Sequence, residues 1–339
     1  MISVIIPNFN YAQFLKKRID SILKQTLLPD EIIFLDDNST DNSIQIAKKA
    51  LGKTSVPFFI VSNGENGGSV FKQWQKGIEK ARGDYIWIAE SDDASAPDFL
   101  KNCIETLEKD NSIGLCYCES MVINKNNRII DHDFFQRIHN YIDPEKWQKN
   151  YIANGRDEVC NYLFIRNTIP NASAVVFRSG ALRNIGGIPS EYKFSGDWIA
   201  YIKILNKWNI AYLRKALNYK RFHNNSVTHS HVNTGVHFSE ALRIANYCLE
   251  NFDIPENSKK EFALNILFQI KYSQNQAKLD IELLENMKKI LGRKAVNEAL
   301  IATINKHNIE FADLRTDFLF RLRKLSTNKI IKKIFKGKI

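Results

Sequence analysis

The chain has 339 residues, and its 48 lysines and arginines against 37 aspartates and glutamates give a formal net charge of +11. Hydrophobic residues make up 44% and charged residues 25%, which is typical of a soluble globular protein and excludes a collagen, a disordered tail or a polytopic membrane protein. No apolar run approaches the roughly 20 residues of a membrane-spanning helix. The positive charge favours a polyanionic partner, such as nucleic acid, anionic lipid or a phosphorylated substrate.

The first 120 residues alternate short apolar runs with amphipathic stretches. The N-terminus has no basic region or cleavage site, so we expect a strand there rather than a secretion signal. Strands are expected at 3–7, 31–35, 58–62, 85–89 and 114–119, and helices at 11–25, 41–51, 69–81 and 97–107. This alternation predicts an α/β fold with a doubly wound, mostly parallel sheet flanked by helices.

The rest of the chain is less regular. Residues 121–170 read as a polar excursion with one or two helices, and then come a strand at 171–178, a helix at 197–207 and a late edge strand at 211–219. From about residue 234 the pattern is helical. We therefore expect a domain at 1–230, with halves 1–120 and 121–230, and a helical C-terminal extension at 231–339. Five cysteines fit no CxxC or zinc spacing, which favours free thiols in a reducing cytosol.

Acidic side chains follow two of the predicted strands, where a parallel sheet binds its ligands. Asp36 and Asp37 come directly after the second strand. One of them can cap the next turn, while the other needs a partner such as a base N–H, a ribose hydroxyl or a cation. Glu90, Asp92 and Asp93 follow the fourth strand, and clustered carboxylates suit Mg²⁺ or Mn²⁺. The alternative is an acidic turn that caps the next helix.

Three further segments allow both a structural and a functional interpretation. The stretch from Pro7 to Asn10 can be a plain strand-to-helix turn or part of a binding site. Asp197 begins a predicted helix, as an N-cap or as a general base. His223 follows Arg221 in a basic, loop-like stretch at the end of the late strand, as a surface or satisfied histidine or as one that meets phosphate or metal.

Two nucleotide-binding motifs are absent from the sequence, since no GxGxxG follows the first strand and no GxxxxGK[ST] occurs. A dinucleotide dehydrogenase and a P-loop NTPase are therefore disfavoured. A sugar nucleotidyltransferase stays open, although it would carry a Gly-rich basic loop directly after strand one. A basic nucleic-acid-binding protein also fits the charge, but the strand ends here are acidic, so we expect no nucleic acid.

Taken together, these segments resemble the inverting nucleotide-sugar glycosyltransferases of family 2, which have the GT-A fold. The resemblance covers about residues 1–230, and it rests on an ordered set of segments: SVIIPNFNY, SILKQT, DEIIFLDDNSTD, GDYI before ESDD, GDW and RFHNNS. It implies a hexosyltransferase that uses a nucleotide-sugar donor, UDP-linked in our expectation, with Mn²⁺ or Mg²⁺ as cofactor.

The resemblance also implies roles for single residues. Asp197 would be the general base, and burial beside Trp198 would raise its pKa. Arg221 would contact the diphosphate. The expected metal residues are Asp92, Glu90, Asp93 and His223, and the expected nucleotide-binding residues are Pro7, Phe9, Asn10, Asp36, Asp37, Gly68, Lys72, Ser91 and Asp92. Two departures are Glu90, where the family's D-x-D begins with aspartate, and Phe9, where tyrosine is frequent.

The expected acceptor is a glycan or lipid-linked glycan in bacterial surface polysaccharide or lipooligosaccharide synthesis. Residues 323–339 hold seven lysines and arginines and no acid, with Ile330, Ile331, Ile334 and Phe335 on one helical face. This pattern is typical of a helix that lies on an anionic membrane, and a solvated tail is the alternative. We expect a cytoplasmic protein, either free or peripheral on the inner face of the cytoplasmic membrane.

Overall fold

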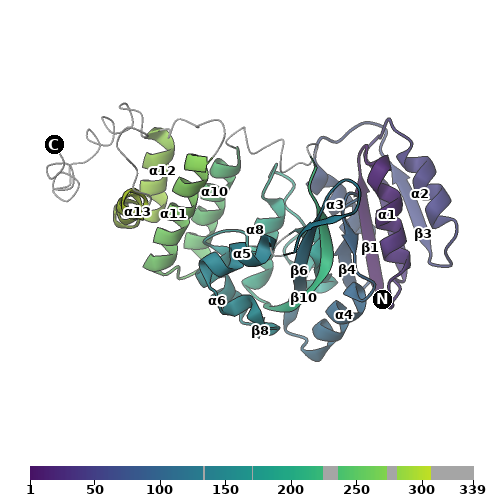
Figure 1. The fold of residues 1–339 in the computed structure, drawn as a ribbon, viewed down its shortest axis with the longest axis horizontal. Coiled ribbons are helices and arrows are strands. Elements are labelled where there is room, and N and C mark those ends of the chain that lie inside the picture. The colour runs from purple at the N-terminus through teal and green to yellow at the C-terminus, as the bar shows by residue number, and fades with distance from the viewer. Residues whose placement is uncertain (133, 170, 224–235, 273–280, 307–339) are drawn as a thin grey trace. The chain divides into compact units, whose positions relative to one another are not determined.

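The computed structural model describes residues 1–132, 134–169, 171–223, 236–272 and 281–306 (Figure 1). The chain divides into two units, Met1–Ile254 and Pro255–Ile339. The first unit holds the sheet and its helices together with α10 (Val236–Asn251). The boundary predicted at residue 230 falls outside the described residues, and the division between units comes further along the chain.

The first unit is built around one ten-stranded sheet with the order β3-β2-β1-β4-β9-β6-β10-β5, to which β7 adds beside β6 and β8 beside β10. The strands are β1 (Ile2–Asn8), β2 (Glu31–Asp36), β3 (Phe58–Ser62), β4 (Tyr85–Ile88), β5 (Ala94–Ser95), β6 (Ile113–Ile123), β7 (Ile129–Asp131), β8 (Tyr151–Ala153), β9 (Val175–Arg178) and β10 (Asn209–Arg221). The predicted strands are all present, within a few residues of their expected bounds.

The longest ladders of the sheet are parallel. β1 pairs in parallel with β2 and β4, β2 with β3, and β6 with β10. β9 runs antiparallel between β4 and β6. The late strand β10 was expected at the sheet edge, and this prediction is wrong, because β5 and β8 pair with its other side. The carboxyl ends of β1, β2 and β4 therefore meet at one rim.

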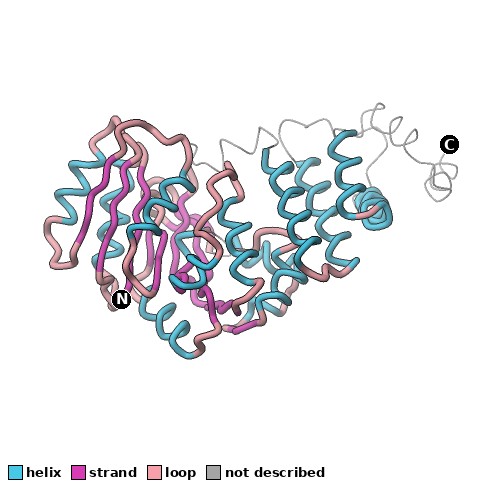
Figure 2. Tube along the Cα trace, turned by 180° about the vertical axis from the view of Figure 1, so that it is seen from behind, coloured by secondary structure: helices cyan, strands magenta, loops and turns pink. Residues whose placement is uncertain are grey.

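Helices cover both faces of this sheet (Figures 1 and 2). The apolar sides of α1 (Ala12–Leu23), α2 (Ser43–Leu51) and α4 (Phe99–Lys109) share one hydrophobic core with one face of the strands. On the opposite face, α3 (Val70–Lys80) approaches so closely that a Cβ on Gly77 would collide with Ile5. Phe177 stacks there on Tyr201 of α8 (Gly196–Leu205). Burial on both faces accounts for the nearly continuous apolar strands.

The excursion between β6 and β9 contains β7, α5 (Phe134–Ile142), a 3₁₀ turn at Lys146–Gln148, β8, α6 (Gly155–Glu158) and a π turn at Val159–Leu163. Lys146 anchors it, with its Nζ 2.7 Å from Glu158 and 4.1 Å from the ring centres of Tyr151 and Tyr162. The short helix α7 (Ser179–Asn184) then leads to Gly186 and Gly187, which both have positive φ. All five cysteines are free, as predicted.

The second unit contains α11 (Glu256–Tyr272), α12 (Ile281–Leu291) and α13 (Arg293–Lys306). The prediction of a helical C-terminal region is confirmed for the described residues, 236–272 and 281–306. The expected basic amphipathic tail at 323–339 lies outside the described residues. Within the part of the chain that the structure describes, no helix has the length and apolar character needed to span a bilayer.

Candidate active site

The turn after β1 is locked to the turn after β2 by side-chain hydrogen bonds. Asp36 is fully buried, and it accepts hydrogen bonds from Asn8 Nδ2 at 3.0 Å and from the backbone N–H of Ser39 at 2.8 Å. Asn10, with φ of 56°, accepts from the backbone N–H of Thr40 at 2.8 Å. Asp36 is thus the acid that stabilises the turn, and we assign it a structural role.

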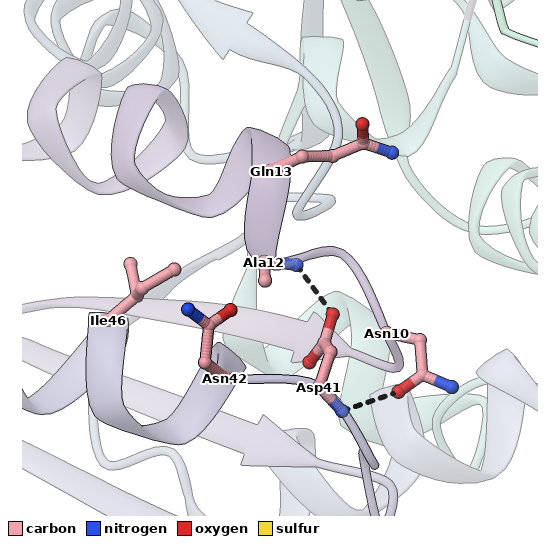
Figure 3. A pocket seen from close by; sticks show the side chains of 6 residues that line it. All are labelled: Asn10, Ala12, Gln13, Asp41, Asn42 and Ile46. Atoms are coloured by element: carbon pink, nitrogen blue, oxygen red, sulfur yellow. Dashed lines mark hydrogen bonds between the residues drawn. The ribbon is translucent and has the colours of Figure 1, made fainter.

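Beside these turns lies a pocket of about 380 Å³ (Figure 3). Its lining residues come from the first turns of α1 and α2 and the loops before them: Asn10, Ala12, Gln13, Asp41, Asn42 and Ile46. Asp41 accepts from the backbone N–H groups of Ala12 and Ser43, both at 3.0 Å, and so joins the two helices. Asn10 is the one predicted site residue in this lining.

Asp37 lies at the centre of a set of hydrogen-bond donors. Its carboxylate is 5% exposed, and Oδ1 accepts from Asn63 Nδ2 at 2.6 Å, Gly67 N at 2.9 Å and Gln73 Nε2 at 2.7 Å. These donors come from the loop after β3 and from α3. The same loop contains Gly68, with φ of 64°, and it receives Lys72, whose Nζ is 3.5 Å from the Gly67 carbonyl. One oxygen of Asp37 is thus fixed, and its orientation is set.

The polar residues after β4 make different contacts. Ser91 donates to the carbonyl of Pro7 at 2.6 Å and so ties the ends of β1 and β4. Asp93 is 3% exposed, and it accepts from the backbone N–H of Arg221 at 2.8 Å and from Asn171 Nδ2. Burial, followed by the charge of Asp92, raises its pKa to about 6. Both oxygens of Asp93 are used within the protein, which weighs against its predicted role at a metal.

Glu90 carries a buried carboxyl oxygen. Its Oε1 has no hydrogen-bond partner among the described residues, and burial, with Asp92 and Asp93 next, raises its pKa well above the usual value. Arg18 lies beside it, completely buried, and donates from Nε to the Glu90 carbonyl at 2.7 Å. Arg18 is not among the site residues expected from the sequence. An arginine on the buried face of a predicted helix was the available signal.

Asp92 and His223 form a pair at the rim. His223 Nε2 lies 2.9 Å from Asp92 Oδ2, and the imidazole packs against the rings of Tyr11 and Phe14. These contacts bring together two side chains that are 131 positions apart in sequence. Two of the side chains expected at the metal are therefore adjacent in the structure.

Arg221, next to this pair, is 2% exposed. Its guanidinium donates to the carbonyl of Asp92 at 2.5 Å, to the carbonyl of Asn124, and to Asn127 Oδ1 at 2.7 Å, and it stacks on Phe14. All three of its nitrogens are therefore engaged within the protein. The predicted contact with a diphosphate stays a prediction, against which this geometry weighs.

Among the described residues, no three histidine, cysteine or acidic side chains are grouped as a metal-binding cluster. Two ligand-type groups do meet at Asp92 and His223. Magnesium bound with a nucleotide takes one or two carboxylates, and the phosphates and water complete its shell. The donor set at this rim fits a cation that arrives with a diphosphate.

Asp197 stands in the first turn of α8. Its Oδ1 accepts the backbone N–H of Trp198 at 2.7 Å, and Asn167 Nδ2 lies 3.5 Å from Oδ2. Burial raises the pKa of Asp197 to about 6, against the opposing effects of the Trp198 N–H and the Lys220 ammonium. A carboxylate with a raised pKa, held at a helix N-terminus, is suited to accept a proton.

Helix α3 contacts residues at three places where the sequence singled out acids: Asp37, the acids after β4, and the start of α8 beside Asp197. Gln73 donates to Asp37, Trp74 faces Glu90 beside Asp92, and the ring of Phe71 packs on Gly196, where a Cβ would lie 2.8 Å from it. Burial lowers the pKa of Lys220, and the charges of Asp93, Asp197, Asp92 and Glu90 oppose that shift, so Lys220 lies near the acids after β4 and also near Asp197. The strand ends and the N-terminus of α8 therefore border one region.

The sequence is similar to that of known glycosyltransferases. Residues 3–167 match the family model described as Glycosyl transferase family 2. Chondroitin synthase of Pasteurella multocida (strain Pm70) is 28% identical over 134 residues, which are 40% of this chain and 14% of that protein. An uncharacterised glycosyltransferase of Rickettsia typhi is 24% identical over 235 residues, 69% of this chain and 67% of its own length. The chain thus spans a small part of the synthase that it matches.

Solved structures share the fold. S. aureus TarS 1–349 in complex with UDP superposes with a TM-score of 0.64 at 17% identity, covering 89% of this chain and 84% of that one. The mannosyltransferase PcManGT of Pyrobaculum calidifontis, in complex with GDP-Man and Mn²⁺, gives 0.56 at 14% identity, covering 98% and 82%. Residues 3–167 therefore carry a domain that matches glycosyltransferase family 2, and the chain has the GT-A fold.

Proposed function

We propose that this chain transfers a sugar from a UDP-sugar to an acceptor hydroxyl with inversion at the anomeric carbon. The observation that carries the proposal is that Asp37, the Asp92–His223 pair and Asp197 border one region around α3. Structures of the same fold hold UDP, UDP-GlcNAc and GDP-Man, which supports a nucleotide-sugar donor.

The nucleotide would bind over the ends of β1 and β2. Asp37, with Oδ1 fixed by three donors, presents its other oxygen to a base N–H. Phe9 is 44% exposed beside it and offers a ring to pack on the base, next to Pro7. Gly68 and Lys72 lie in the loop that closes around Asp37, so the Lys72 ammonium can approach a phosphate.

Asp92 and His223 would hold Mn²⁺ or Mg²⁺, with Glu90 nearby. When bound, the cation would neutralise negative charge on the diphosphate leaving group. Lys220, half-buried near the acids, would add a second positive charge on that side of Asp197.

Asp197 would take the proton of the acceptor hydroxyl as that oxygen attacks the anomeric carbon. With a pKa of about 6 it is ionised at neutral pH, yet it is a better base than an exposed aspartate. Trp198 N–H and Asn167 fix its two oxygens, so the basic lone pairs have a defined direction.

The acceptor we propose is a glycan or lipid-linked glycan of a bacterial surface polysaccharide, made on the cytoplasmic side of the membrane. Relatives of the matched segment include chondroitin and hyaluronan synthases, which supports polysaccharide synthesis.

The test is a thermal-shift screen of UDP- and GDP-sugars with Mn²⁺, followed by an assay of nucleotide release. Specific binding to the folded state raises Tm. Asp92→Ala should lose Mn²⁺-dependent UDP binding in calorimetry, and Asp197→Asn should keep UDP binding but lose turnover. Wild-type turnover in Asp197→Asn would remove that residue from the mechanism. Stabilisation by a nucleoside triphosphate and a sugar phosphate would favour a sugar nucleotidyltransferase. Stabilisation by DNA, without affinity for UDP, would favour a nucleic-acid-binding protein.

A further inference from the structure

Glu240 is a buried acid outside the segments that the sequence singled out. It lies on α10, in the region that the sequence assigned to the C-terminal extension, and its side chain is 8% exposed. A buried carboxylate is costly unless it is hydrogen-bonded or paired. What Glu240 contacts therefore indicates why an acid is placed there.

The partners of Glu240 are three successive backbone N–H groups. Oε1 accepts from Lys193 at 2.6 Å, and Oε2 accepts from Phe194 at 3.0 Å and from Ser195 at 2.8 Å. Consecutive backbone N–H groups that converge on one point form an anion-binding concavity, which the carboxylate fills. These bonds span 45 to 47 positions of sequence, so they join α10 to a distant loop.

The loop that Glu240 holds runs directly into Asp197. Ser195 is the N-cap of α8, but its side chain makes no capping bond, so Glu240 satisfies the N–H at this end. Gly196 follows and is pressed against Phe71. The backbone on the N-terminal side of Asp197 is thus fixed by Glu240 and by α3.

A second set of contacts joins the same helix to the same loop. Arg243 stacks on Tyr192 at 4.5 Å, and its guanidinium lies 3.4 Å from Glu191. His237 lies beside the ring of Phe194. One face of α10 therefore runs along residues 191–195, and Glu240 is the buried member of that face.

We propose that Glu240 is a positioning residue for Asp197, and that α10 is for this reason part of the transferase rather than of the extension. The proposal rests on the function proposed above, in which Asp197 is the base. Glu240 does not touch the reacting groups. It holds the 193–195 backbone so that the carboxylate of Asp197 keeps its place and its shielding from water.

The first test is amide hydrogen exchange in the full chain. Glu240→Gln replaces one acceptor oxygen by an N–H₂ group, which cannot accept from the loop. The amides of residues 193–195 should then exchange at least about tenfold faster, since a hydrogen bond to a charged group is worth more than a factor of ten in stability. Glu250→Gln is the matched control, because Glu250 is exposed on the same helix and bonds only to Asn246 among the described residues. Unchanged exchange in Glu240→Gln would overturn the proposal.

The second test separates positioning from folding. In Glu240→Gln we expect kcat for UDP release from the donor chosen by the screen to fall about 10- to 100-fold, as for a small displacement of a catalytic group, while the Kd for UDP with Mn²⁺ stays within about twofold. The acidic limb of the pH–rate profile should move to lower pH, because a base that gains water loses its raised pKa. The groups that face Asp197 and stay unchanged are Lys220 on β10, Asn167, and Tyr201 on α8.

A loss of folded protein would lower the rate without moving that limb. Glu240→Asp keeps the charge and should show smaller changes of the same kind. If exchange rises but kcat and the limb stay at wild-type values while Asp197→Asn is inactive, the positioning role is refuted. If Asp197→Asn itself keeps wild-type turnover, the proposed function fails, and the exchange data alone decide whether Glu240 orders the loop.

Discussion

Replacing Asp197 by asparagine should make the protein more stable at neutral pH while it removes activity. Asp197 is ionised at pH 8, yet burial raises its pKa from 3.8 to about 6, so the ionised form is disfavoured in the folded state. A carboxyl with a raised pKa contributes stability that is fully present below the unfolded pKa and is lost as the pH rises through the folded pKa. At pH 8 that loss is complete, and an uncharged side chain avoids it.

The size of the effect follows from the pKa. Each tenfold change in proton affinity corresponds to about 1.4 kcal/mol, so a rise from 3.8 to about 6 corresponds to about 3 kcal/mol at pH 8. Asparagine can still accept the Trp198 N–H through Oδ1, but its amide would face Asn167 Nδ2, and Lys220 would lose a counter-charge. We therefore expect a net gain of about 1–2 kcal/mol in the free energy of unfolding, with a hydrogen bond of about 1 kcal/mol disturbed.

Urea denaturation of both proteins at pH 8 and at pH 4 measures this. The gain should be present at pH 8 and nearly absent at pH 4, where folded wild type carries the proton. Asp253→Asn, at an exposed position, is the control and should change the free energy of unfolding by less than about 0.5 kcal/mol at either pH. A gain in the free energy of unfolding of equal size at both pH values, or a loss at pH 8 alone, would show that the ionised carboxylate of Asp197 does not destabilise the folded protein.

Arg221→Met should lower the free energy of unfolding by about 3 kcal/mol, because it leaves buried acceptors unpaired, and it should change the Kd for UDP of the folded protein less than about threefold. Lost UDP binding at unchanged stability would instead support a diphosphate contact. Asp37→Ala should weaken UDP binding at least about tenfold, and it should also lower Tm because three donors lose their acceptor. Calorimetry measures the first effect and thermal denaturation the second. Wild-type UDP affinity in this variant would remove Asp37 from the nucleotide site.

The sheet and the positions of the acids were predictable because each rests on a local pattern. Apolar runs of strand length and helical repeats predicted the alternation of strands and helices. A parallel sheet then brings the carboxyl ends of its strands together at one rim. Asp37 was recognised as an acid with no local use after a buried strand. Its donors, Asn63 and Gln73, could not be predicted, since they come from a later loop and helix.

The division of labour among the charged residues was much less predictable. Three acids after β4 looked alike in sequence, but only the three-dimensional structure shows Asp93 bonded to Asn171 and to the backbone of Arg221. Arg221 was expected at the diphosphate because the segment RFHNNS resembles the family's basic segment near that group. In the fold it is buried and holds the carbonyls of Asp92 and Asn124. Which of these charges is structural depends on pairings across 78 to 129 positions of sequence, and no local pattern contains them.

The domain boundary after β10 could not be predicted from local sequence patterns either. The composition changes near residue 230, where helices replace strands, and a boundary there is the natural inference. Yet Glu240 lies beyond that point and binds three N–H groups next to Asp197. Because Glu240 of α10 accepts the backbone N–H groups of the loop before the proposed base, α10 belongs to that site, although it lies in the helical part of the sequence. A chain cut at residue 230 should therefore lose the order of residues 193–195, whereas one cut after Ile254, where the first unit ends, should keep it.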